Sequence, residues 1–393
     1  MIQNSTENPE SKAKTGERFY RPELDALRFF AFLGVFFFHL KPHSIPPGLL
    51  RYTAIPLVSS LFRLGNDALG AGNFGVDLFF VLSAYLITEL LVREKARRGS
   101  LDVKAFYVRR ILRIWPLYFF FIGVACLLQV LMSEQVFSWQ YVLAFLLLSG
   151  NWICALHGLP ASVAQPLWSV SIEEQFYLLW PQVVRRASAK SLATVAVGLL
   201  VMASGVRFVL LARHTTMQML GYGTFTRLDG IAVGILISLI LRGRVPSLST
   251  GVRFLFVFLG LGGLMGAFEL LAGTAPGAAP TRPGGMLSFP LVGIACTLLF
   301  LSALGLPAER TRLVGWFRLV YLGKISYGLY VYHLLALLLV HSALSPLRVA
   351  LYPVYALLAF GLTVALSVAS YHILELPFLK LKERFTYVLS RPR

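Results

Sequence analysis

Charged residues are scarce in this chain of 393 residues. Asp, Glu, Lys and Arg make up 14% of it, whereas a soluble domain averages about 25%. Hydrophobic residues account for 57% of the sequence, and the mean hydropathy is +0.71. This composition excludes a water-soluble globular protein. Because the apolar residues also occur in runs of roughly 20, the length that a helix needs to cross a hydrocarbon layer about 30 Å thick, the sequence predicts an all-α, polytopic membrane protein.

Cysteine and acidic residues are also few. Cys126, Cys154 and Cys296 lie in or beside apolar segments and lack the spacing of metal ligands, so we expect neither a disulfide framework nor a metal site. Acidic residues number 18 against 36 basic ones, which gives a net charge of +18. Such a charge would suit a nucleic-acid-binding protein. The basic residues, however, occur in short segments between apolar runs, so we expect a lipid bilayer and no nucleic acid as a partner.

Ten apolar segments are candidate membrane spans: 24–42, 73–92, 111–132, 166–184, 191–212, 226–241, 252–272, 286–305, 321–344 and 350–374. A shorter apolar stretch, 139–153, predicts a re-entrant or interfacial helix. We therefore expect about ten transmembrane helices in one membrane domain over 21–382. We expect the remaining residues to form a disordered cytoplasmic tail over 1–20 and a second cytoplasmic tail over 383–393.

The positions of Lys and Arg predict which side of the membrane each segment faces. If the N-terminus is cytoplasmic, 27 of the 36 basic residues fall in segments on that side and six in segments on the other. Cytoplasmic loops of membrane proteins carry an excess of Lys and Arg. Counting 139–153 as a full span would reverse every later segment and remove this bias. The sequence thus predicts a multi-pass protein of the cell (inner) membrane with both termini in the cytoplasm.

Three arginines lie within the bilayer toward the predicted cytoplasmic side, where an ionisable group is costly and needs a reason. They are Arg28 in the first span, and Arg110 and Arg113 in FYVRRILRIWP at the start of the third. Arg110 and Arg113 are three residues apart and share one helix face. Two guanidinium groups on one face suit two-point binding of phosphate. The alternative interpretation is that they anchor the helix at its cytoplasmic end.

A second group of polar residues lies toward the outer side. It comprises His39, Asp77, Glu173, Arg227 and Asp229. An imidazole paired with a carboxylate is the usual arrangement of a general base, because the carboxylate fixes the tautomer and stabilises the imidazolium. The alternative is a set of salt bridges that hold the helices in register. His333, alone near the middle of the ninth span, is either a structural hydrogen-bond partner or part of a site.

Seven segments of the chain, in this order, resemble the acyltransferase-3 family of integral-membrane O-acyltransferases: RPELDALRFFAFLGVFFFHL, FGVDLFFVLSAYLITELL, FYVRRILRIWPLYF, LWSVSIEEQFYLLWP, TRLDGIAVG, LGKISYGLYVYHL and YHILELPFLKLK. They extend from residue 21 to residue 382. The family's first-helix histidine corresponds to His39, its paired arginines to Arg110 and Arg113, and the acidic residue of its S-x-x-E-type motif to Glu173.

The resemblance implies a ten-helix domain that takes an acyl group from cytoplasmic acyl-CoA, usually acetyl-CoA. The group would pass to a hydroxyl of a sugar, a glycan or a glycosylated small molecule. Acyl-CoA would be a co-substrate, and no permanently bound cofactor is expected. We assign Arg227, Asp229, His333 and Tyr85 to acceptor binding. The sequence departs from many relatives at Tyr85, because LSAYLIT has Ala-Tyr where they have Gly-Phe, and Tyr85 can reshape a channel wall.

The spacing within the first span allows this reaction. Arg28 and His39 are eleven residues apart, roughly 16 Å along a helix, a separation comparable to the extended pantetheine arm of CoA. We expect the phosphates at the arginines and His39 as general base, oriented by Glu173 or Asp77. A covalent acyl-histidine intermediate is the mechanistic alternative. A transporter that uses the same buried charges as a path, and a non-catalytic assembly partner, are the alternative functions. The sequence indicates no oligomeric state.

Overall fold

A computed structural model describes residues 20–40, 56–132, 136–272, 280–306, 314–344 and 352–385. Most of both predicted tails lies outside these ranges: residues 1–19 of the first and residues 386–393 of the second. The described parts form helices and no strand: α2 (Pro22–Leu40), α4 (Pro56–Ala71), α5 (Gly75–Arg98), α6 (Val103–Leu131), α7 (Trp139–Leu146), α8 (Gly150–His157), α9 (Leu167–Arg186), α10 (Ala189–Ala212), α11 (Met217–Tyr222), α12 (Asp229–Leu241), α13 (Thr250–Ala272), α14 (Arg282–Ala303), α15 (Val314–Lys324), α16 (Ser326–Leu344), α17 (Tyr352–Ser370) and α18 (Leu376–Lys382).

Seven helical stretches among the described residues are long and apolar enough to cross a membrane. They correspond to seven of the ten predicted spans, so the all-α membrane class is confirmed and the count of about ten is not. The other three predicted spans are α2, α9 and α12. Helix α2 carries Glu23, Asp25 and Arg28 within 19 residues, and α12 has 13 residues. Helix α9 is continuous, but the polar run 173–175 interrupts its apolar sequence. Polar side chains and shortness thus set these three apart.

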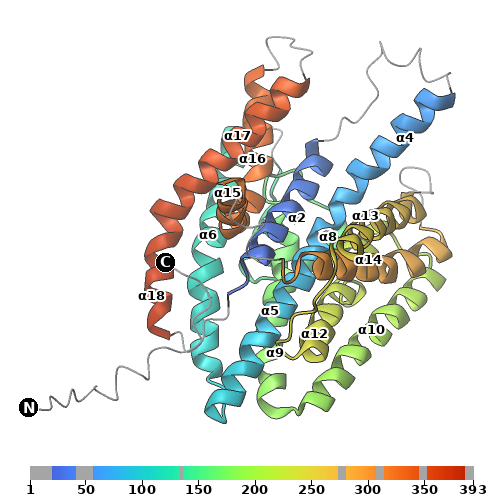
Figure 1. Ribbon diagram of the computed structural model, residues 1–393. Coiled ribbons are helices and arrows are strands. Elements are labelled where there is room, and N and C mark those ends of the chain that lie inside the picture. The colour runs from blue at the N-terminus through green and yellow to red at the C-terminus, as the bar shows by residue number, and fades with distance from the viewer. Residues whose placement is uncertain are drawn as a thin grey trace, which may run out of the picture.

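Residues 56–71, between the first two predicted spans, form a helix that the sequence analysis does not predict. Helix α4 runs through the short 3-10 turn Gly72–Phe74 into α5, and the two form one long rod in Figure 1. Leu57, Leu61 and Leu64 recur at the spacing of one helix face. The predicted spans 321–344 and 350–374 are also interrupted, the first at Ile325 and the second by the π-helical turn Tyr371–Glu375.

The short apolar stretch 139–153 does not cross the bundle. It forms α7 and α8, which are eight residues each and are joined by a turn at Leu148 with a φ of 55°. The two ends of this hairpin meet, because the backbone N–H of Val136 donates to the carbonyl of Ala161 at 2.7 Å. Tyr141 also donates its hydroxyl to the Gly158 carbonyl at 2.8 Å. The chain therefore enters and leaves on the same side, as a re-entrant segment does.

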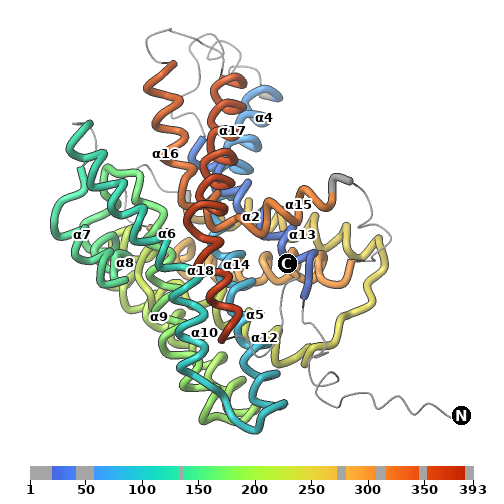
Figure 2. Tube along the Cα trace, turned by 90° about the vertical axis from the view of Figure 1, so that its left-hand side faces the viewer, coloured from blue at the N-terminus to red at the C-terminus, as the bar shows by residue number. Residues whose placement is uncertain are grey.

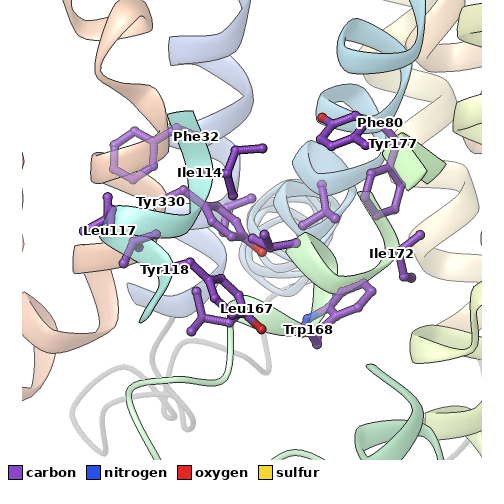
Figure 3. Packing of buried hydrophobic residues seen from close by; sticks show 14 of the residues in the cluster. Phe32, Phe80, Ile114, Leu117, Tyr118, Leu167, Trp168, Ile172, Tyr177 and Tyr330 are labelled. Atoms are coloured by element: carbon purple, nitrogen blue, oxygen red, sulfur yellow. The ribbon is translucent and has the colours of Figure 1, made fainter. Parts of the chain in front are cut away.

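Helix α2 lies at the centre of the bundle, between α4 and α5 on one side and α15 and α16 on the other (Figure 1). It crosses the start of α5 closely at Gly34 and Gly72, where a Cβ on Gly72 would lie 2.2 Å from the Gly34 carbonyl oxygen. Helix α6 packs along α9 and α18, and α7 and α8 lie beside it (Figure 2). Figure 3 shows buried side chains of α2, α5, α6, α9 and α16 meeting in one core. The candidate site lies within this core.

Candidate active site

The three arginines predicted to bind phosphate line one cavity. Its volume is about 90 Å³, and its walls come from α2, α5, α6, α9 and α16. Arg28 of α2 faces it together with Arg110 and Arg113 of α6. The polar residues of the remaining wall are Ser83, Ser169, Glu173, Tyr177, Ser326, Tyr327 and Tyr330. Ile114, Tyr177 and Tyr330, which also line this space, are among the buried side chains labelled in Figure 3.

Arg110 is held by aromatic rings and leaves its N–H groups available. Its guanidinium carbon lies 5.4 Å from the ring centre of Phe106 and 5.3 Å from that of Tyr177. Within the described ranges it makes no hydrogen bond or ion pair to another side chain. Its neighbour Arg109 differs, because it donates to Glu94 at 2.9 Å and to the Phe385 carbonyl at 2.7 Å. The geometry therefore distinguishes an arginine whose N–H groups are available from an adjacent one whose N–H groups are used within the protein.

Glu173 belongs to the arginine cavity. One of its carboxylate oxygens accepts a hydrogen bond from Ser83 at 3.3 Å, and the other accepts one from the Tyr177 hydroxyl at 2.8 Å. The guanidinium group of Arg110 lies over the ring of Tyr177, so the hydrogen bond from Tyr177 to Glu173 helps to position the ring that Arg110 contacts. The sequence interpretation had grouped Glu173 with His39 at the outer level. The structure places it with the arginines instead.

His39 pairs with another histidine. Its Nδ1 lies 2.9 Å from the Val35 carbonyl and 3.3 Å from Nε2 of His333, and the two ring centres are 4.9 Å apart. His333 is fully buried, and its Nδ1 lies 2.6 Å from the Tyr330 carbonyl. A carbonyl can only accept, so Nδ1–H of His333 donates to it, and the neutral ring presents Nε2 as an acceptor. His39 then donates from Nδ1, which leaves the lone pair of its Nε2 available.

Tyr330 connects the histidine pair with the arginine cavity. Its hydroxyl, in the cavity wall, lies 2.8 Å from the Ser169 hydroxyl and donates to the Pro166 carbonyl at 3.0 Å. Its carbonyl accepts from His333, three residues further along α16. One helical turn of α16 therefore separates Tyr330, in the wall of the arginine cavity, from the histidine pair.

Neither carboxylate expected to orient His39 contacts it. Glu173 binds Ser83 and Tyr177, as described above. Asp77 accepts a hydrogen bond from Arg227 at 2.9 Å, in an ion pair in which both side chains are buried. His333 therefore occupies the place predicted for a carboxylate. For Asp77, the geometry matches the alternative interpretation, a salt bridge that holds helices in register.

A second buried ion pair joins this one. Asp229 accepts two hydrogen bonds from Arg207, at 2.5 and 2.9 Å, and Arg207 has no exposed surface. The ring of Phe289 lies between the two pairs, 5.2 Å from the guanidinium carbon of Arg207 and 5.1 Å from that of Arg227. Two cations and two anions from α5, α10, the start of α12 and the turn before it thus form a neutral cluster. Arg227 and Asp229 are enclosed by protein partners, and their predicted role in acceptor binding finds no open surface here.

Sequence reasoning assigned no role to Arg207. The available signal was a single arginine in the apolar run 191–212, which demands a buried anionic partner. Tyr85 also differs from its predicted place on a channel wall. It is 1% exposed and packs its ring on Phe300 of α14 at 4.7 Å, outside the arginine cavity. No cluster of three or more His, Cys, Asp or Glu side chains suited to a metal occurs among the residues that the structure describes.

The neutral cluster makes a stability prediction. Arg207→Met should destabilise the protein by about 3–5 kcal/mol, because Asp229 would remain buried without its partner. The double variant Arg207→Met with Asp229→Leu should recover most of this loss, since it removes both charges together. Thermal unfolding of the purified protein in one detergent measures all three forms. Equal losses in the single and double variants would contradict the ion-pair explanation.

Comparison with known proteins identifies relatives over almost the whole chain. A family model described as an acyltransferase domain matches residues 21–372. The Bacillus subtilis protein named "Putative peptidoglycan O-acetyltransferase YrhL" is 30% identical over 93% of this chain. The peptidoglycan O-acetyltransferase OatA of Listeria monocytogenes is 26% identical over 92% of it. The chain spans about half the length of these relatives, 56% in both cases. No solved structure shows significant similarity to the chain.

Proposed function

The chain belongs to the acyltransferase-3 family, and we propose that it transfers an acyl group from acyl-CoA to a hydroxyl of a glycan. The observation that carries this proposal is the arrangement of Arg110 and His39. The guanidinium group of Arg110 packs against aromatic rings, has available N–H groups and faces the arginine cavity. Tyr330, in the wall of that cavity, binds His333, and His333 in turn contacts His39, whose Nε2 lone pair is available. The names of the relatives support an acetyl group and a peptidoglycan-type acceptor.

The arginine cavity would bind the phosphates of the donor. Arg28, Arg110 and Arg113 converge from two helices on one space. Guanidinium groups bind phosphate oxygens at two points, and such charge-assisted hydrogen bonds are stronger than neutral ones. The stacking of Arg110 on Phe106 and Tyr177 fixes its plane before the ligand arrives. Preorganisation of this kind lowers the entropy cost of binding.

The acyl thioester would lie near the histidine pair. Arg28 and His39 sit on one helix, roughly 16 Å apart at 1.5 Å per residue. The extended pantetheine arm is of comparable length. The arm would run along α2 from the arginines, past Tyr330, toward His39. The donor's nucleotide and its thioester could then occupy different depths of the same bundle.

His39 would act as the general base through Nε2. It removes the proton of the acceptor hydroxyl while the hydroxyl oxygen attacks the thioester carbonyl carbon. The C–S bond breaks, and the CoA thiolate leaves and takes up the proton. The Val35 carbonyl and Nε2 of His333 would together hold His39 in the required tautomer, because both accept from Nδ1–H of His39 before and after His39 is protonated.

The direct test of this activity uses the purified chain in nanodiscs with acetyl-CoA and a soluble peptidoglycan fragment. We expect release of free CoA that depends on the fragment, together with an acetyl ester on the glycan detected by mass spectrometry. A transporter would leave acetyl-CoA intact. Intact acetyl-CoA in the presence of acceptors of several glycan classes would refute an acyltransferase activity of this chain.

We propose that the arginine cavity opens toward the cytoplasm of a bacterial inner membrane. The turns after α5 and α9 lie at one end of the bundle (Figure 1), since Lys95 donates to the carbonyls of Val184 and Ala187. A cysteine-free variant carrying Arg98→Cys should resist a membrane-impermeant thiol reagent in intact cells. The same background with Arg213→Cys, at the opposite end of α10, should be labelled. Labelling of position 98 alone would reverse the orientation.

A further inference from the structure

A second and much larger cavity lies between α2, α4, α5, α13 and α14. Its volume is about 600 Å³, and its lining is almost entirely apolar. Ala31, Leu78 and Leu264 form its inner wall, and each has less than a tenth of its surface exposed. At its rim, Phe30 and Phe254 are more than half exposed. Helices α13 and α14, which contribute to its lining, pack against α4 and α5 at one side of the bundle (Figure 1).

The apolar lining of this cavity favours an apolar ligand over water. Water enters a cavity only where it finds two to four polar partners, and apolar cavities accept apolar molecules instead. The helices that form the walls include membrane-spanning stretches, so the medium at the rim is hydrocarbon, which is as apolar as a Leu side chain. A flexible hydrocarbon chain can therefore enter from the bilayer without losing any hydrogen bond.

One end of the cavity carries a positive charge. Arg253 lines it there and donates to the carbonyls of Ser302, Leu304 and Gly305 at 2.6, 2.9 and 3.0 Å. These bonds cap the end of α14. No ion pair of Arg253 with a carboxylate occurs within the described residues. Arg253 also donates to the Leu248 carbonyl, so its N–H groups are used within the protein. It would attract the phosphate headgroup of an amphiphile through its charge rather than through direct hydrogen bonds.

We propose that this cavity binds one acyl chain of a membrane glycerophospholipid, with the phosphate headgroup at the Arg253 end. The site is separate from the arginine cavity that would bind acyl-CoA. It lies against α2, the helix that also carries Arg28 and His39, so the bound chain would take the place of packing contacts that the protein does not supply to this helix.

Phosphatidylglycerol with a diazirine in the middle of one chain provides the test. The full chain is reconstituted in vesicles containing this probe, irradiated and digested, and labelled residues are located by mass spectrometry. Lipid around the protein can label exposed side chains such as Phe254. Ala31 and Leu78 are buried, so they are labelled only if the chain enters the cavity. We expect labelling at both residues, and its loss when an excess of unlabelled phosphatidylglycerol is present.

A blocking variant and a matched control complete the experiment. Leu264→Trp fills the cavity and should abolish labelling of Ala31 and Leu78. Leu255→Trp places the same residue on the exposed side of α13, outside the cavity, and should leave labelling unchanged. Val257→Trp, at the rim, replaces Leu264→Trp if the latter fails to fold. Labelling confined to exposed residues, labelling unaffected by both blocking variants, or displacement by polyprenyl phosphate but not by phosphatidylglycerol would each overturn the proposal. None of these outcomes depends on acyltransferase activity.

Discussion

Replacing His39 with Ala is expected to reduce acyl transfer by about 10²–10⁴-fold, the usual loss for a positioned general base. The structure gives His39 a hydrogen bond through Nδ1 to Val35 and His333, so that Nε2 is left to accept a proton. The binding of acyl-CoA should remain close to wild type, because the arginine cavity is built from other side chains. Initial rates of CoA release and equilibrium binding of acetyl-CoA, both in nanodiscs, measure the two effects separately.

Variants of His333 distinguish a positioned base from general damage to the core. His333→Phe keeps a ring in the buried site but removes one of the two acceptors for Nδ1 of His39, so that only the Val35 carbonyl remains. It should lower kcat with little change in the KM for acetyl-CoA. His333→Gln supplies an amide oxygen that can accept the same hydrogen bond, and should restore part of the rate. Well-folded His39→Ala protein that transfers acyl groups within tenfold of the wild-type rate would show that another group is the base.

Replacing Arg110 with Ala is expected to weaken the binding of acetyl-CoA by roughly 10- to 150-fold, which corresponds to the loss of a charge-assisted hydrogen bond of about 1.5–3 kcal/mol. Arg110→Lys should recover only part of this affinity, because an ammonium group makes no planar two-point contact with phosphate. It would also lose the contacts of the guanidinium group with the rings of Phe106 and Tyr177.

The control for Arg110 is Lys104→Ala, which removes one positive charge from an exposed position on the same helix. It should leave acetyl-CoA affinity unchanged, since it lies outside the arginine cavity. Isothermal titration in nanodiscs at fixed ionic strength compares the four proteins. Equal affinities in wild type, Arg110→Ala and Arg110→Lys would reduce this arginine to a membrane anchor. Equal losses in Arg110→Ala and Lys104→Ala would reduce its effect to overall charge.

Composition and hydropathy predicted the all-α membrane class. A hydrophobic run of membrane length must pair its own backbone N–H and C=O groups within the bilayer, and a helix does so. Seven of the ten proposed spans followed from the same signal. Helix α4 was missed because its amphipathic pattern lies in a polar segment and shows no apolar run. For 139–153 the sequence predicts one re-entrant or interfacial helix, because the apolar stretch is short and the charge bias requires an even number of crossings. The structure forms two helices there, α7 and α8.

The arginine cavity was predictable in part, and the histidine pair was not. Arg110 and Arg113 are three residues apart on one helix, so their common direction can be read from the sequence. His39 and His333 are 294 residues apart, and their contact depends on how α2 and α16 are rotated and offset. Glu173 was assigned to the wrong neighbours for a related reason. The sequence gives the position of a residue along its own helix, but it does not give how far that helix is shifted along the membrane normal relative to its neighbours.

The central claim is that the donor binds at the arginine cavity and the acceptor reacts near His39, at different depths of one bundle. Proteoliposomes with uniformly oriented protein test it directly. Labelled acetyl-CoA is supplied only on the side of the α5–α6 turn, and a peptidoglycan fragment only on the opposite side. The account predicts acetylated glycan, and none when the two substrates exchange sides. Transfer that requires both substrates on the same side of the membrane would contradict it.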